Sequence, residues 1–120
     1  MNMTNQNKVN QAFKKSLGYI CDYAAKNPDI KRLVVFGNAL DLENPADRDD
    51  EMHVAVYLND PTPAKIETIA RYINDNIDLV WACMIDDEKY DDSPILKQTI
   101  SKGVTVYGEW RHFRKRNSWI

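Results

Sequence analysis

The chain has 120 residues, of which 43% are hydrophobic and 28% are charged, so it suits one domain with a single core and is too short for two. No apolar run approaches the ~20 residues of a membrane span, and the polar residues 1–6 lack the hydrophobic stretch of a signal peptide. We therefore expect a cytoplasmic protein with no membrane association, in which Cys21 and Cys83 are reduced thiols.

The net charge of −2 hides an uneven distribution along the chain. Residues 1–108 carry 12 Lys and Arg against 17 Asp and Glu, whereas residues 109–120 carry four Lys and Arg against one Glu. An acidic body opposes nonspecific nucleic-acid binding, and a basic segment attracts acidic surfaces. We divide the chain into one domain, residues 1–108 with its N-terminal helix, and a basic and aromatic C-terminal tail, residues 109–120.

The first predicted element is an amphipathic helix between Val9 and Lys26. Its apolar residues recur every three or four positions and so lie on one face of the helix; they are Val9, Phe13, Leu17, Ile20 and Ala24. Pro28 ends the helix. The unbroken apolar run Leu33–Phe36 then predicts a strand buried on both faces.

A glycine turn and a second strand follow. Gly37-Asn38 predicts a turn in which Asn38 caps a following helix, and residues 41–50 predict a polar loop with many Asp. The second strand runs to Leu58, and its successive side chains point to opposite faces. Glu51 and His53 therefore share one face, beside the glycine turn.

The rest of the domain predicts two helices and two strands. Thr62-Pro63 is an N-cap followed by Pro at the first helical position, and this helix ends near Asn76. Residues 77–85 predict a third strand with apolar residues on both faces, which favours a central place in the sheet. Ser93-Pro94 opens a third helix that ends before Gly103, and Val104–Tyr107 predicts the last strand.

Three parts of this pattern resemble the minimal nucleotidyltransferase domain of the DNA polymerase beta superfold. Phe36-Gly37-Asn38 stands where that family has an apolar residue followed by Gly-Ser, and Glu51-Met52-His53 stands where it has Asp-x-Asp. Residues 93–107 resemble the family's closing helix and strand. The resemblance covers residues 30–108 and implies an α/β (α+β) nucleotidyltransferase fold, a mixed sheet of about four strands with helices packed on one side.

An ungapped count from Gly37 gives a second register, which places Asp49 and Glu51 in the two acidic positions. That register leaves Asp50 and His53 where the family keeps apolar residues, so we prefer the first one.

The resemblance implies roles for five residues. Gly37 and Asn38 would bind the nucleotide, and Glu51, His53 and Asp78 are the candidates for catalysis and for binding a metal. In an active member, paired carboxylates hold Mg²⁺, which stabilises charge on the transferring phosphoryl group. Mg²⁺ is therefore expected as a cofactor only if the protein is active.

Each motif position carries an altered residue, which predicts a catalytically degenerate site. Glu51 extends the carboxylate by one methylene, and such a displacement of a metal can cost about 10²-fold in rate. His53 is a neutral ligand that suits Zn²⁺, Ni²⁺ or Cu²⁺ better than Mg²⁺. Asn38 replaces a hydroxyl that binds phosphate in the family. The plain alternatives are a solvated edge-strand position for His53, ordinary charges for Glu51 and Asp78, and a solvated acidic loop over residues 47–51.

Two main functions remain open. The first is a pseudoenzyme that serves as a binding or regulatory module, such as the antitoxin-like partner of a helical HEPN-type protein; this inference is an analogy between folds. The alternative is an active metal-dependent nucleotidyltransferase that moves NMP from NTP to a protein or small-molecule hydroxyl. A third, purely structural hypothesis is a homo-oligomer. The tail could stack on bases, but its aromatic residues favour docking on its own domain or across a homodimer.

Overall fold

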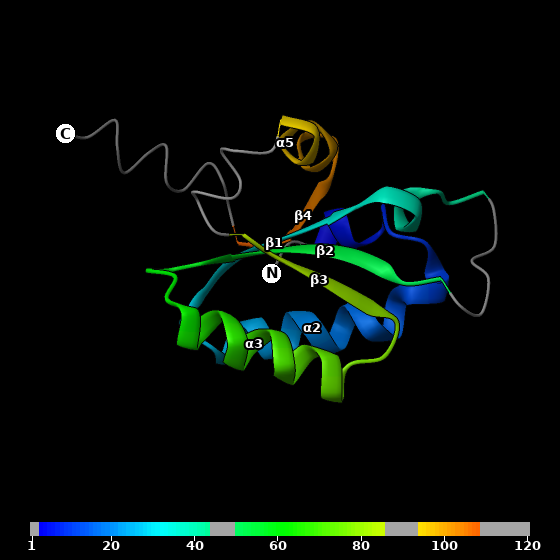
Figure 1. Ribbon diagram of the computed structural model, residues 1–120. Coiled ribbons are helices and arrows are strands. Elements are labelled where there is room, and N and C mark those ends of the chain that lie inside the picture. The colour runs from blue at the N-terminus through cyan, green and yellow to red at the C-terminus, as the bar shows by residue number, and fades with distance from the viewer. Residues whose placement is uncertain (1–2, 44–49, 86–93, 109–120) are drawn as a thin grey trace, which may run out of the picture.

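Four strands form one mixed sheet, and helices cover both of its faces (Figure 1). The computed structural model describes residues 3–43, 50–85 and 94–108. The predicted α+β class with four strands in a mixed sheet is confirmed. In chain order the elements are α1 (Met3–Gln6), η1 (Gln11–Phe13), α2 (Lys14–Lys26), β1 (Ile30–Phe36), η2 (Gly37–Leu40), β2 (Met52–Leu58), α3 (Pro63–Asn76), β3 (Val80–Ile85), α5 (Pro94–Ser101) and β4 (Val104–Tyr107).

The first predicted helix is formed by η1 and α2 together. Its five predicted apolar residues, from Val9 to Ala24, are all buried. Asn10 fixes the start of this segment, because its side-chain oxygen accepts a hydrogen bond from the Ala12 N–H at 2.9 Å. The Asn10 N–H in turn donates to the carbonyl of Ala39 at 2.7 Å, which ties the segment to η2.

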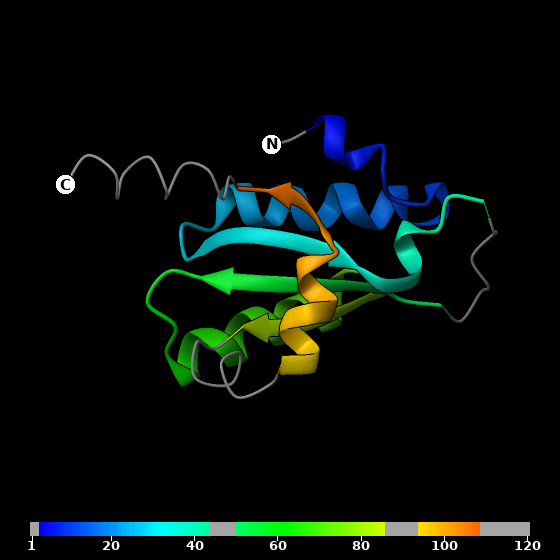
Figure 2. The same cartoon turned by 90° about the horizontal axis from the view of Figure 1, so that it is seen from above.

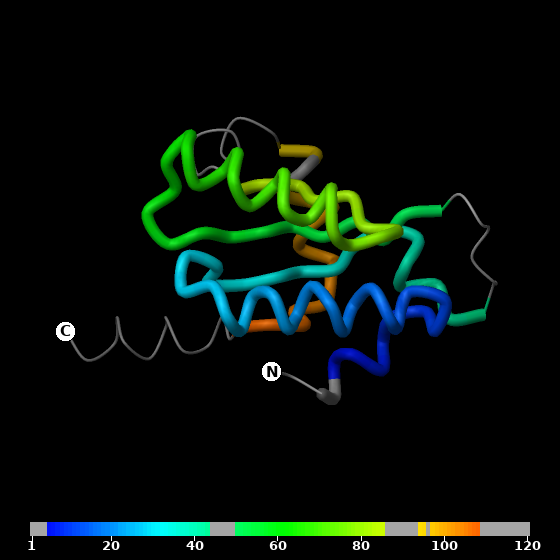
Figure 3. Tube along the Cα trace, turned by 90° about the horizontal axis from the view of Figure 1, so that it is seen from below, coloured from blue at the N-terminus to red at the C-terminus, as the bar shows by residue number. Residues whose placement is uncertain are grey.

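Helix α3 begins and ends where its sequence predicts. The Thr62 hydroxyl accepts a hydrogen bond from the Lys65 N–H at 3.3 Å, and Pro63 occupies the first helical position. Ile69 and Ile73 face the core. Helices α2 and α3 run side by side across one face of the sheet (Figure 3), and no helix of the described residues has the length and hydropathy to cross a bilayer.

The sheet order is β3-β2-β1-β4. β1 pairs with β2 and with β4 in antiparallel fashion, and β2 pairs with β3 in parallel. The prediction of a central third strand is therefore wrong, because β3 lies at an edge and Trp81 is 48% exposed. Its apolar residues face both ways because helices cover both faces of the sheet.

The core has two parts, one on each face of the sheet. The larger part lies between the sheet and α2 and α3, and the smaller part lies under α5. Helix α5 crosses the sheet on the face opposite to α2 and α3 (Figure 2). The smaller part comprises Val34, Phe36, Ala55, Tyr57, Ile85 and Ile100.

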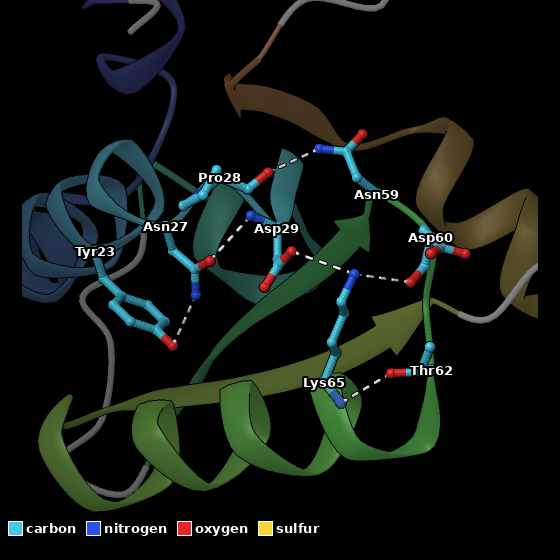
Figure 4. A network of polar contacts seen from close by, with 8 residues as sticks. All are labelled: Tyr23, Asn27, Pro28, Asp29, Asn59, Asp60, Thr62 and Lys65. Atoms are coloured by element: carbon cyan, nitrogen blue, oxygen red, sulfur yellow. Dashed lines mark hydrogen bonds and ion pairs between the residues drawn. The ribbon is translucent and has the colours of Figure 1, made fainter.

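A polar network fastens the end of the sheet where β1 begins and β2 ends (Figure 4). The Asp29 carboxylate lies 3.4 Å from the Lys65 ammonium of α3. The Asn59 side chain donates to the carbonyl of Pro28 at 3.0 Å, and the Asn59 N–H donates to the carbonyl of Asp29 at 2.8 Å. Since the ion pair is partly exposed it contributes little by itself, and the backbone contacts define the corner.

Cys21 lies in the core where α2 meets β4. Its thiol donates to the carbonyl of Val106 at 3.8 Å and accepts from the Gln6 side chain at 3.7 Å. Burial, together with the nearby Asp22 carboxylate, raises the pKa of this thiol to about 11. The folded state therefore favours the neutral thiol.

We expect alkaline pH to weaken the fold through this thiol. Between the ordinary pKa of 9.0 and the folded value of about 11, the unfolded state releases the proton first, so the free energy of unfolding falls by up to about 2 kcal/mol. Urea unfolding at pH 8 and pH 10.5 measures this fall. Cys21→Ala should show a smaller fall than the wild type, and equal falls would contradict the assignment.

Candidate functional site

The predicted site residues gather at one end of the sheet. Phe36, the last residue of β1, pairs with His53 near the start of β2, and Met52 pairs with Val80 at the start of β3. Gly37 follows Phe36, and Glu51 precedes Met52. Asp78 precedes β3 by two residues, so it belongs to the same end of the sheet.

Gly37 forms the turn that the sequence predicts. Its φ angle is +79°, a left-handed conformation that favours glycine, and it is exposed. A Cβ added there would lie 3.4 Å from Nδ1 of His53. The turn and the second strand are therefore in direct contact.

The helix predicted after Gly37 is only the single 3-10 turn η2, and the prediction of Asn38 as its cap is wrong. Phe36 occupies the N-cap position and makes no side-chain capping bond. Asn38 is exposed, and its carbonyl accepts the Asp41 N–H at 3.0 Å. The apolar run after Gly37 is too short to sustain an amphipathic helix, so the chain leaves this turn directly.

His53 lies in a row of aromatic rings that crosses three strands. Its ring centroid lies 5.6 Å from that of Phe36 and 5.0 Å from that of Trp81, and both pairs are tilted. His53 is half-buried on the inner strand β2, so its interpretation as a solvated edge-strand residue is wrong. We call Phe36, His53 and Trp81 the aromatic row.

A cavity of about 430 Å³ opens beside Gly37. Gly37 and Leu40 line one side, and Gln98, Thr99 and Lys102 at the end of α5 line the other. Sequence reasoning missed the three α5 residues because polar side chains at helical spacing look like an ordinary solvated face. Only the packing of α5 over the sheet brings them to Gly37.

Glu51 and Asp78 do not join this cavity. Glu51 lines a separate cavity of about 270 Å³ at the outer edge of β3, together with Trp81 and the α3 residues Ala70 and Asn74. Asp78 is exposed. Within residues 3–43, 50–85 and 94–108, no three His, Cys, Asp or Glu side chains form a group that could hold a metal.

These residues therefore do not make up the Mg²⁺ site that the resemblance implies. Asp47 and Asp49, the additional acidic candidates, lie outside the described residues, as does Ser93, the predicted cap of α5.

Comparison with known proteins finds no family model, no curated protein and no solved structure that matches this chain. The resemblance to minimal nucleotidyltransferases thus depends on the motif positions described above.

The same substitution at two glycines should have opposite effects on stability. Gly37→Ala places a Cβ on a left-handed backbone and should cost about 1–2 kcal/mol. Gly18→Ala lies in α2, where an added Cβ meets nothing within 4 Å, and should stabilise by about 0.5–1 kcal/mol. Urea unfolding measures both, and equal stabilities of the two variants would contradict the strained turn.

Proposed function

We propose that this chain is a nucleotidyltransferase-like binding protein that holds a nucleotide at the Gly37 end of the sheet and does not transfer it. The observation that carries the proposal is the position of the cavity beside Gly37. It lies on the α5 face of the sheet, next to the aromatic row, so a cation and an exposed ring flank the same glycine turn.

The cavity has the chemistry to receive phosphate groups. Lys102 supplies a positive charge, and the Gln98 amide supplies hydrogen-bond donors. Because Gly37 has no side chain and is exposed, a ligand can approach its backbone closely. A volume of about 430 Å³ falls within the range of small-molecule sites.

The aromatic row supports binding of a planar base. Trp81 is 48% exposed, whereas Phe36 is 4% exposed, so the row begins in the core and ends at the surface. Nucleotide bases stack on exposed aromatic rings with a gain of about 1–3 kcal/mol per base. His53 packs between the two other rings and keeps Trp81 beside the cavity end of the sheet.

The same geometry argues against phosphoryl chemistry at this turn. In the family position of the second acidic residue stands His53, whose ring contacts are aromatic. Glu51, in the position of the first, lines the other cavity. No paired carboxylates from the described residues face the Gly37 cavity, so the proposal assigns binding and no catalytic step.

Isothermal titration with ATP in the absence of divalent cations tests the binding. Lys102→Ala should weaken the affinity by at least about tenfold, since hydrogen bonds to charged groups contribute about 1.5–3 kcal/mol. Lys15→Ala, an exposed lysine on α2, is the matched control and should leave the affinity unchanged. Equal affinities for both variants, or no ATP binding by the wild type, would reject the site.

Incubation with labelled ATP and Mg²⁺ or Mn²⁺ tests the alternative of an active enzyme. We expect no label on the protein or on candidate acceptors. Transfer that is abolished by Glu51→Ala would instead establish an active nucleotidyltransferase.

The helical HEPN-type partner stays a prediction from the resemblance. The neighbouring reading frame is its simplest check, because an adjacent gene for a helical ribonuclease would favour an antitoxin-like role.

A further inference from the structure

A second surface, independent of the proposed function, lies between α2 and α3. A groove of about 380 Å³ opens there, and three tyrosines dominate it: Tyr19 and Tyr23 from α2, and Tyr72 from α3. Asp22 and Lys26 also line it. We call it the tyrosine groove, and it lies on the helical layer that Figure 3 views face on.

The groove exposes more aromatic surface than the interior needs. Tyr19 is 52% exposed and Tyr72 is 43% exposed. Tyrosine is enriched at the centres of binding interfaces, because its ring buries much apolar area at little cost in side-chain entropy. Two large exposed tyrosines around one groove therefore indicate a binding surface.

The tyrosines are held in place before anything binds. Tyr23 and Tyr72 stack with their ring centroids 4.0 Å apart and their planes 15° apart. The Tyr23 hydroxyl accepts a hydrogen bond from the Asn27 side chain at 3.2 Å, and Asn27 accepts from the Asp29 N–H at 3.0 Å. Figure 4 shows this connection to the corner network. A preorganised surface loses little entropy on binding.

The chain leaves the described domain close to this corner. Gly108 follows β4 with a φ of +78°, and a Cβ added there would collide with the carbonyl oxygen of Lys31. Lys31 follows Asn27 by only four residues. The 12 residues from 109 to 120 can span roughly 40 Å when extended, which exceeds the 29 Å width of the molecule.

The chemistry of this segment complements the groove. It holds Trp110, Phe113 and Trp119 together with four Arg and Lys, while residues 1–108 carry an excess of five negative charges. Guanidinium groups stack favourably on tyrosine faces, and Asp22 offers a carboxylate within the groove. Burying three large aromatics also removes an exposed apolar patch.

We propose that residues 109–120 dock into the tyrosine groove of their own chain. Arg111 and Arg114 pack against the tyrosine rings, and Trp110 and Phe113 cover the apolar surface between α2 and α3. The segment then acts as a strap that joins β4 to the helical layer. It leaves the Gly37 cavity, on the other face of the sheet, open.

Limited digestion of the full chain with trypsin, followed by mass spectrometry, tests the strap. Docking protects the bonds after Arg111 and Arg114, and cleavage follows the population of the undocked form. Tyr19→Ala combined with Tyr72→Ala should accelerate loss of the segment by roughly tenfold. Ile95→Ala, at a side chain 80% exposed on α5, is the control and should not change the rate.

Three outcomes would overturn the proposal. Equal cleavage rates in the wild type and the tyrosine variant would show that the groove does not hold the segment. Protection that increases with protein concentration, with a doubled mass in light scattering, would assign the groove to the segment of a second copy. Protection that appears only on adding another protein would assign it to that partner.

A second measurement guards against a folding defect of the tyrosine variant. Trp110→Ser combined with Phe113→Ser leaves the described domain unaltered. In NMR spectra of the full chain this variant should shift the ring signals of Tyr19 and Tyr72 and leave that of Trp81 unchanged. Unshifted tyrosine signals would reject the docking.

Discussion

Burial of β1 on both faces and along both edges is the constraint on which the rest of the structure depends. Leu33, Val34, Val35 and Phe36 are all at most 4% exposed. A strand with apolar side chains on both sides needs a covering layer on each face, so α2 and α3 pack on one side and α5 on the other. The strand also ends in an abrupt change of direction at Gly37, which lies at the rim of the α5 face.

The elements themselves could be predicted from local patterns. Spacing at three and four residues identified the buried face of η1 and α2, and Thr62-Pro63 located the start of α3, because both signals depend on neighbours in the sequence. The position of β3 could not be predicted in this way. An edge strand covered on both faces has the same apolar pattern as a central one, and the strand order is decided by pairing between distant segments.

The candidate site divides along the same line. The contact of Gly37 with His53 follows from the succession of strand, turn and strand, and could be predicted. The contribution of Lys102 could not, since it is 65 residues away from Gly37 in the sequence and reaches it only through the packing of α5. The direction of Glu51 was likewise hidden, because Glu51 precedes the paired part of β2, where strand alternation no longer fixes a side chain.

The pairing of β1 with β4 has a consequence for the birth of the protein. Leu33 pairs with Tyr107, and Val106 is fully buried. During synthesis the ribosome releases β1 long before β4, so one edge of the central strand waits without its neighbour while some seventy further residues are made. Contacts so remote along the chain slow folding, and an open edge in a nascent chain invites association with other chains. The last strand is therefore the step that commits the nascent polypeptide to a closed sheet.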